Sequence, residues 1–172
     1  MLKSGGILAY PTEAVFGLGC DPDNAWAVQR LLALKQRPVG KGLILIAADF
    51  AQLEPFVEPL EASVMSRIWP TWPGPVTWLL PARSVTPCWL TGRHDTLAVR
   101  VTAHLLAAAL CRTAGPLVST SANRSNHPPA RSALQVRLRL DGNFDDIVVG
   151  NCGGRAQPST IRDGRTGEVI RS

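Results

Sequence analysis

Lysine is scarce in this chain. Only Lys3, Lys35 and Lys41 occur among 172 residues, so arginine supplies nearly all of the 18 cationic side chains. The net charge of +5 favours partners that carry phosphate or carboxylate groups, which guanidinium binds through two parallel hydrogen bonds. Nucleotides and nucleic acids both meet this requirement.

Long apolar runs and paired cysteines are also missing. No run approaches the roughly 18 residues needed to span a membrane, and the start of the chain has no signal-peptide pattern. Cys20, Cys88, Cys111 and Cys152 are widely scattered without a C-x-x-C pair, so neither a zinc site nor a disulfide framework is indicated. We therefore expect reduced thiols in a cytoplasmic protein with no membrane partner.

The common signatures of phosphate binding and nucleophilic catalysis are absent as well. The sequence contains no P-loop, no G-x-G-x-x-G after a strand and no G-x-S-x-G elbow. A pairing of Cys152 with a histidine stays open, although no spacing supports it. Apolar content of 45%, charged content of 18% and the lack of repeats or linkers indicate one globular domain over residues 1–172.

Apolar runs and helical spacing alternate along the chain. Strands are predicted at residues 6–10, 43–47, 76–80, 96–101 and 146–149, with a hairpin turn at 163–168. Helices are predicted at 27–35, from 49 or 51 to 56, and at 60–69, 103–113 and 132–140. Residues 11–20 are interpreted as a loop and 119–123 as a hydroxyl-lined turn. This order predicts an α/β fold with a twisted mixed sheet flanked by helices.

A basic connector at residues 34–42 joins a predicted helix to a predicted strand. It places Lys35, Arg37 and Lys41 close together, and Pro38 and two glycines keep it irregular. Such a loop can surround an anion. The alternative is a solvated basic turn at the C-terminus of a helix, where cations are favourable in any case.

Arg100 is the single charge in the apolar run 96–101. A charge on a buried strand needs an anionic partner, whereas a strand-end arginine can reach solvent, and both interpretations stay open. Further loops at strand ends offer hydroxyl groups, and in α/β sheets such loops gather in one crevice. We expect this crevice to bind polyanions. The hydroxyls are those of Thr12, Ser119, Thr120, Ser121, Ser159 and Thr160.

Six ordered motifs make the pattern specific. They are Pro11-Thr12-Glu13-x-Val15-Phe16-Gly17-Leu18, Lys35-x-Arg37-Pro38, Trp72-Pro73-Gly74-Pro75-Val76-Thr77, Ala98-Val99-Arg100-Val101, Ser119-Thr120-Ser121-Ala122-Asn123 and Pro158-Ser159-Thr160-Ile161. In this order and over nearly the whole chain, the sequence resembles the YrdC-like family. The resemblance implies a twisted α/β sheet with a basic concave cleft. It also implies synthesis of L-threonylcarbamoyladenylate and pyrophosphate from L-threonine, bicarbonate and ATP.

The resemblance also implies site residues and partners. Lys35 and Arg37 would be catalytic. Threonine and bicarbonate would contact Thr12, Lys41, Arg100 and Ser121, and the nucleotide would contact Ser119, Thr120, Asn123, Ser159 and Thr160. Magnesium would be held by the ATP phosphates rather than by protein ligands. A separate transferase complex would pass the threonylcarbamoyl group to the adenosine next to the anticodon of tRNA, and the basic surface could contact tRNA.

Some positions depart from the family pattern. Ala14 and Phe16 stand where many members have threonine and tyrosine, and Ile46 stands where longer members often have histidine.

The competing interpretation is an RNA-binding module for tRNA or rRNA without catalysis, which the net charge would suit. The sequence lacks the interleaved aromatic and basic side chains of an RNA reader. Steeply salt-dependent RNA binding without ATP consumption would favour that alternative.

Overall fold

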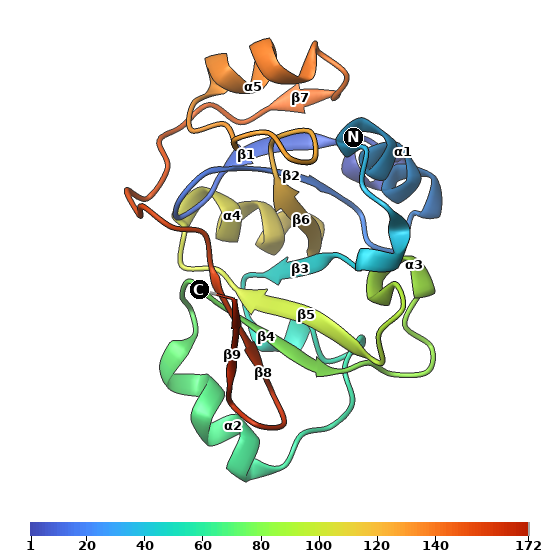
Figure 1. The fold of residues 1–172 in the computed structure, drawn as a ribbon, viewed down its shortest axis with the longest axis vertical. Helices are drawn as coiled ribbons and strands as arrows, with labels where there is room; N and C mark the ends of the chain where they lie inside the picture. The colour runs from blue at the N-terminus through green and yellow to red at the C-terminus, as the bar shows by residue number, and fades with distance from the viewer. Residues whose placement is uncertain (172) are drawn as a thin grey trace.

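A computed structural model describes residues 1–171 of the chain (Figure 1). Within these residues the strands form one nine-stranded sheet in the order β7-β1-β2-β6-β3-β5-β4-β8-β9. The pairs β1/β7, β3/β5 and β4/β8 are parallel and the other five are antiparallel. The predicted mixed α/β sheet is thus confirmed. The strands are β1 (Leu8–Pro11), β2 (Phe16–Cys20), β3 (Ile44–Ala47), β4 (Val76–Pro81), β5 (Thr96–Val101), β6 (Leu117–Ser121), β7 (Asp146–Ile147), β8 (Thr160–Asp163) and β9 (Val169–Arg171).

The α-helices are α1 (Ala25–Lys35), α2 (Ala62–Ile68), α3 (Cys88–Thr91), α4 (Leu105–Ala114) and α5 (Ala133–Leu140). The helix predicted from residue 49 or 51 to 56 is shorter than expected, because Asp49 caps only the 3-10 helix Phe50–Gln52 and Pro55 prevents its continuation. His104 caps α4 by accepting a hydrogen bond from the backbone N–H of Ala107. None of the helices within residues 1–171 has the length and apolar character needed to cross a bilayer.

The loop predicted at residues 11–20 is wrong in its second half, where strand β2 pairs with β1. The glycines of β2 do not make a turn, but leave room for a neighbouring side chain. A Cβ atom on Gly19 would lie 2.8 Å from the Tyr10 ring and 2.7 Å from the Val118 carbonyl oxygen. Likewise, β6 extends into the segment 119–123 that was predicted as a turn, because the strand ends only at Ser121.

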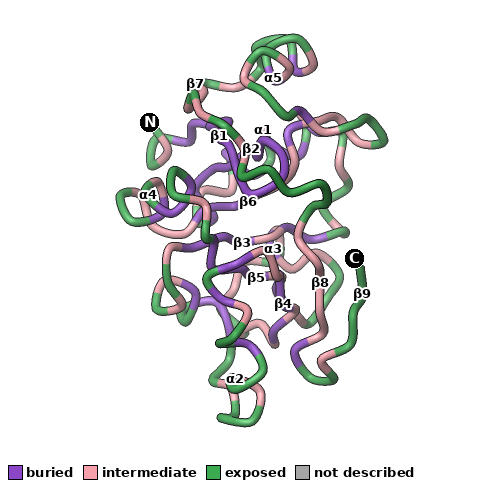
Figure 2. Tube along the Cα trace, turned by 90° about the vertical axis from the view of Figure 1, so that its left-hand side faces the viewer, coloured by how far each residue is buried: buried purple, intermediate pink, exposed green. Residues whose placement is uncertain are grey.

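The two faces of the sheet are covered differently. The main core lies on one face under α1 and α5, and the interiors of β1, β2, β3 and β6 are buried (Figure 2). On the other face, α4 packs on Tyr10, Ile46 and Leu117. Arg100 pairs in register with Ile46, and Ser119 with Ile44, so both residues share this second face. Beyond α4 this face is open, and the cleft described next lies there.

Candidate active site

A cleft of about 300 Å³ opens over the ends of β1, β2, β5 and β6. The connector before β3 and a long segment before β8 form its other walls. Four arginines and one carboxylate line the cleft. The lining residues are Thr12, Glu13, Ala14, Val15, Phe16, Gly17, Arg37, Leu43, Ile44, Pro75, Arg100, Ser119, Thr120, Ser121, Pro129, Arg155, Gln157, Pro158, Ser159 and Arg171.

The loop between β1 and β2 forms the floor beside Arg100. Thr12 closes this loop, because its hydroxyl donates to the Val15 carbonyl at 2.7 Å and its N–H donates to the same oxygen at 3.1 Å. The following side chain, Glu13, forms a 2.7 Å ion pair with Arg100, and both side chains are about nine-tenths buried. Burial alone would raise the pKa of Glu13, but Arg100 and the hydroxyl of Thr102 outweigh it and lower the pKa. The ion pair is therefore charged at neutral pH.

The end of β6 supplies the hydroxyl groups of the cleft. Ser119, Thr120 and Ser121 all line it, with Ser119 buried and the other two partly exposed. The Ser121 hydroxyl donates to Asn123 Oδ1 at 2.6 Å, and the Asn123 amide donates to the His127 carbonyl at 2.5 Å. These bonds order the chain just after the strand.

Lys35 lies behind that segment and does not line the cleft. Its side chain is 3% exposed, and Nζ donates to the Ser121 carbonyl, to the Asn123 carbonyl at 2.8 Å and to Asn123 Oδ1 at 3.2 Å. Burial, together with the nearby charge of Arg37, lowers the pKa of Lys35 from 10.5 to about 8. The ammonium group thus holds the segment that follows β6.

The lowered pKa of Lys35 predicts a specific pH dependence of stability. In the unfolded chain its pKa returns to about 10.4, so above pH 8 the unfolded state binds more protons than the folded state. The free energy of unfolding should therefore rise with pH between about 8 and 10.4 relative to Lys35→Met, by about 1 to 3 kcal/mol. Urea titrations over this range measure the difference, with Lys3→Met, an exposed lysine, as the control. Parallel pH profiles of wild type and Lys35→Met would contradict it.

Arg37 comes from the connector between α1 and β3 and is held by backbone oxygens. Its Nη2 donates to the Gly42 carbonyl at 2.9 Å and its Nε to the same oxygen at 3.3 Å. Burial and the nearby charge of Arg171 lower the pKa of Arg37. Within residues 1–171, no salt bridge to a carboxylate is formed by either arginine. Both side chains also line an adjoining cavity of about 160 Å³, and Lys41 lines that cavity rather than the main cleft.

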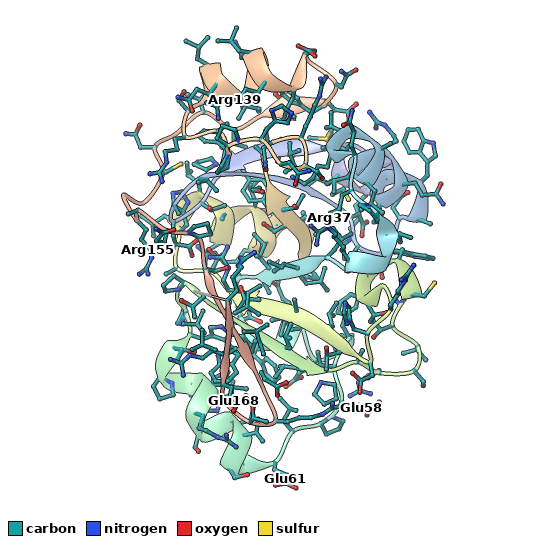
Figure 3. The ribbon with its side chains drawn as sticks, viewed as in Figure 1. Arg37, Glu58, Glu61, Arg139, Arg155 and Glu168 are labelled. Carbon is teal, nitrogen blue, oxygen red and sulfur yellow. The ribbon has the colours of Figure 1, made fainter. Side chains whose placement is uncertain are left out.

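The last wall is residues 150–159, here called the strap, which runs from β7 to β8 (Figure 1). Arg155 in the strap and Arg37 in the connector approach the cleft from different parts of the chain (Figure 3). Glu58 and Glu61 lie in the lower part of the molecule, below both arginines (Figure 3). At the end of the strap, Ser159 accepts a 2.9 Å hydrogen bond from the buried Thr77 hydroxyl.

The whole chain, residues 1–172, matches the Sua5/YciO/YrdC family model, which carries the description "Telomere recombination". The chain belongs to this family. A relative from Nitrosococcus oceani is 61% identical over 99% of this chain and 93% of its own length, and one from Klebsiella pneumoniae is 56% identical over 99% and 91%. Both are named threonylcarbamoyl-AMP synthase, as is a Coxiella burnetii relative that is 50% identical over 99% and 92%.

Solved structures of the Sua5/YciO/YrdC family share the fold. P. abyssi Sua5 complexed with L-threonine aligns with a TM-score of 0.88 and 35% identity over 94% of this chain. The chain spans about half of that longer protein, 48% of its length. E. coli YciO aligns with a TM-score of 0.86 at 24% identity over 99% of this chain and 84% of its own, which supports the fold alone.

The cleft brings together most of the residues that the family resemblance implied. The lining includes Thr12, Arg37, Arg100, Ser119, Thr120, Ser121 and Ser159. It does not include Lys35, Lys41, Asn123 and Thr160. Of the departures, Ala14 and Phe16 line the cleft, whereas Ile46 is buried under α4.

Sequence reasoning missed several lining residues. Glu13 is the only carboxylate in the first motif. The need of Arg100 for an anionic partner could therefore have pointed to Glu13. Arg155 and Gln157 precede the Pro158-Ser159-Thr160 motif in a glycine-rich stretch, so proximity to that motif was their only signal. No signal in the sequence pointed to Arg171, because its position depends on how β9 pairs with β8.

Proposed function

We infer that this chain synthesises threonylcarbamoyl-AMP. The observation that carries this conclusion is 61% identity to a threonylcarbamoyl-AMP synthase over nearly the full length of both chains. The cleft adds physical support, because motifs from six separate parts of the sequence meet there. ATP and L-threonine are the substrates that fit this activity.

The reaction joins three anionic or zwitterionic substrates. We propose that the neutral threonine amine forms a carbamate, either by attacking carbon dioxide and releasing a proton or by attacking bicarbonate and releasing water. A carbamate oxygen then attacks the α-phosphorus of ATP. The bond from that phosphorus to the bridging oxygen breaks, and pyrophosphate leaves with the electron pair. The positive charge of the cleft would offset the repulsion among these anions and hold them close enough to react.

The cleft contacts suggest a division between two ends. Thr12 and Arg100 lie together beside the first loop, and we propose that they bind threonine, Arg100 through its carboxylate. Arg37 and Arg171 lie at the boundary with the adjoining cavity, and we propose that they bind the phosphates. Lys41 lines the same cavity, so we propose that it also binds the phosphates, in place of the predicted contact with threonine and bicarbonate.

The remaining polar groups would hold the nucleotide and the carboxylated amine. We propose that Ser119, Thr120 and Ser159 contact the nucleotide, and that Ser121 contacts the carbamate. Arg155 on the strap adds a further cation to the cleft, beside the loop that carries Thr12 and Glu13. The basic character of the predicted concavity stays a prediction, which these lining charges support.

The predicted catalytic role of Lys35 takes a different form in our proposal. Because its ammonium group donates to oxygens of Ser121 and Asn123, we propose that Lys35 orders this segment and acts on substrate through it. Asn123 would then contribute through the hydroxyl of Ser121, to which it is bonded. Arg37 remains the proposed catalytic cation, in contact with the reacting phosphates. The role of Thr160 at the nucleotide stays a prediction.

The described residues group no set of metal-binding side chains in the cleft. The one carboxylate in the cleft, Glu13, is occupied by Arg100, Thr102 and the backbone of Ala103. Residues 1–171 contain no cluster of three or more histidine, cysteine or acidic side chains suited to a metal. Magnesium bound to the ATP phosphates stays our proposal, and it would neutralise phosphate charge during the transfer.

We also propose partners that act after the synthesis step. The product would pass to a transferase complex that modifies tRNA next to the anticodon, and the basic surface could contact that tRNA. We propose a cytoplasmic location and a single domain over residues 1–172.

Pyrophosphate release by the purified protein tests the proposed function. With ATP and bicarbonate present, release should depend on L-threonine and fall by at least about tenfold with serine or valine, since each lacks the methyl or the hydroxyl that threonine carries. Release with another amino acid but not with threonine would indicate a different carbamoyl-adenylate enzyme. RNA binding without any release would favour the RNA-binding module.

A further inference from the structure

Glu13 places a carboxylate in a cleft whose other charged lining residues are all cations. Its two oxygens accept three hydrogen bonds: from Arg100 Nη1 at 2.7 Å, from the Thr102 hydroxyl at 2.7 Å and from the Ala103 N–H at 3.1 Å. All three donors belong to the end of β5 and the approach to α4. The carboxylate is therefore directed at protein groups rather than at the space where an anionic substrate would lie.

The backbone of the same loop holds the strap. The Thr12 carbonyl accepts from the Gly153 N–H at 3.0 Å, and the Glu13 carbonyl accepts from the Arg155 N–H at 3.1 Å. Gly153 lies so close that a Cβ atom there would be 3.0 Å from the Glu13 carbonyl oxygen. Glu13 thus contacts two cleft walls: its side chain bonds to Arg100 and its backbone to the segment carrying Arg155.

The Arg100 guanidinium needs such a partner, because an uncompensated buried charge is strongly unfavourable. Glu13 satisfies Nη1, whereas Arg100 Nε is buried without an acceptor within residues 1–171. The remaining nitrogen, Nη2, makes no hydrogen bond within residues 1–171 and is not fully buried, so it is the donor that can face the cleft. A rigid guanidinium with one end fixed and donors left over is suited to binding a second carboxylate.

We propose that Glu13 is a positioning residue, which fixes Arg100 in the orientation that binds the carboxylate of the amino-acid substrate. This inference rests on the proposed function, since it takes the amino acid to be the ligand of Arg100. Glu13 does not touch the reacting atoms and acts only through the arginine. Its removal should therefore weaken amino-acid binding more than nucleotide binding.

Glu13→Gln tests this role, because the amide keeps the size of the side chain but loses its charge. We expect the KM for threonine to rise at least about tenfold, with the KM for ATP changed less than about twofold. In an Arg100→Gln background, Glu13→Gln should add almost nothing to the threonine KM. Asp145→Asn is the matched control, since Asp145 also holds an arginine, Arg30, and a backbone N–H, but lies outside the cleft.

Equal changes in both KM values, or the same effect with and without Arg100, would show a merely structural role and overturn the inference. If Glu13→Gln fails to fold, Thr102→Val removes one donor to the carboxylate and should raise the threonine KM in the same direction by a smaller factor. An unchanged threonine KM in that variant would equally overturn the inference. Wild-type protein without threonine-dependent release would instead refute the proposed function, so the two failures are distinct.

Discussion

Arg37→Ala should lower threonine-dependent pyrophosphate release by at least about a hundredfold, which corresponds to about 2.7 kcal/mol of transition-state stabilisation. Arg37 lines the cleft beside Arg171, and within residues 1–171 no carboxylate forms a salt bridge with it. Its positive charge is therefore free to act on substrate phosphates. Steady-state rates at saturating threonine and ATP measure the loss.

Two further variants make this prediction specific. Arg37→Lys should keep only part of the rate, because an ammonium group lacks the planar fork that binds two phosphate oxygens. Arg165→Ala is the control, since Arg165 is exposed and pairs with Asp95 away from the cleft. The free energy of unfolding of Arg37→Ala should change by less than about 1 kcal/mol, because the lost hydrogen bonds go to a loop carbonyl. Release at the wild-type rate in Arg37→Ala would refute the assignment.

Lys35→Ala should lower both stability and activity, unlike Arg37→Ala. Its ammonium group donates to oxygens of Ser121 and Asn123, and removing the donor leaves these acceptors unpaired in a largely buried place. We expect the free energy of unfolding to fall by about 2 to 4 kcal/mol. Pyrophosphate release should fall at least about tenfold, because the segment after β6 loses its position.

Lys35→Met separates the two contributions of the side chain. Methionine fills most of the space of the lysine stem but donates no hydrogen bond. If the donor is what matters, Lys35→Met should lose as much activity as Lys35→Ala while recovering part of the stability. Denaturant unfolding and pyrophosphate release on the same samples measure both quantities. A stable Lys35→Ala protein without activity would instead mean that Lys35 acts directly on substrate.

The sequence predicted well those features that depend on local pattern. Apolar runs that alternate with segments of helical spacing predicted the mixed sheet. The ordered motifs indicated which loops meet in the cleft. Of the two interpretations left open for Arg100, the structure shows the one with an anionic partner, because Arg100 forms an ion pair with Glu13. A charge among four apolar strand residues needs an opposite charge wherever that partner lies along the chain.

The features that sequence reasoning missed depend on packing between distant segments. The glycines of β2 looked like turn residues, but Gly19 is needed because the Tyr10 ring occupies the place of its side chain. Lys35, expected at the site, lies behind the end of β6 rather than in the cleft lining, because its Nζ bonds there to backbone oxygens, and its catalytic role stays a prediction. Arg171 enters the lining only because β9 returns along β8. No local pattern encodes these three arrangements.

Product analysis with ¹³C-labelled bicarbonate tests the central claim most directly. The purified protein is supplied with ATP, L-threonine and the labelled bicarbonate, and the nucleotide product is analysed by mass spectrometry. Our account predicts an adenylate that contains both threonine and the label, heavier by one mass unit than the product from unlabelled bicarbonate, and absent when threonine is omitted. An adenylate without the label, or no adenylate at all, would contradict it.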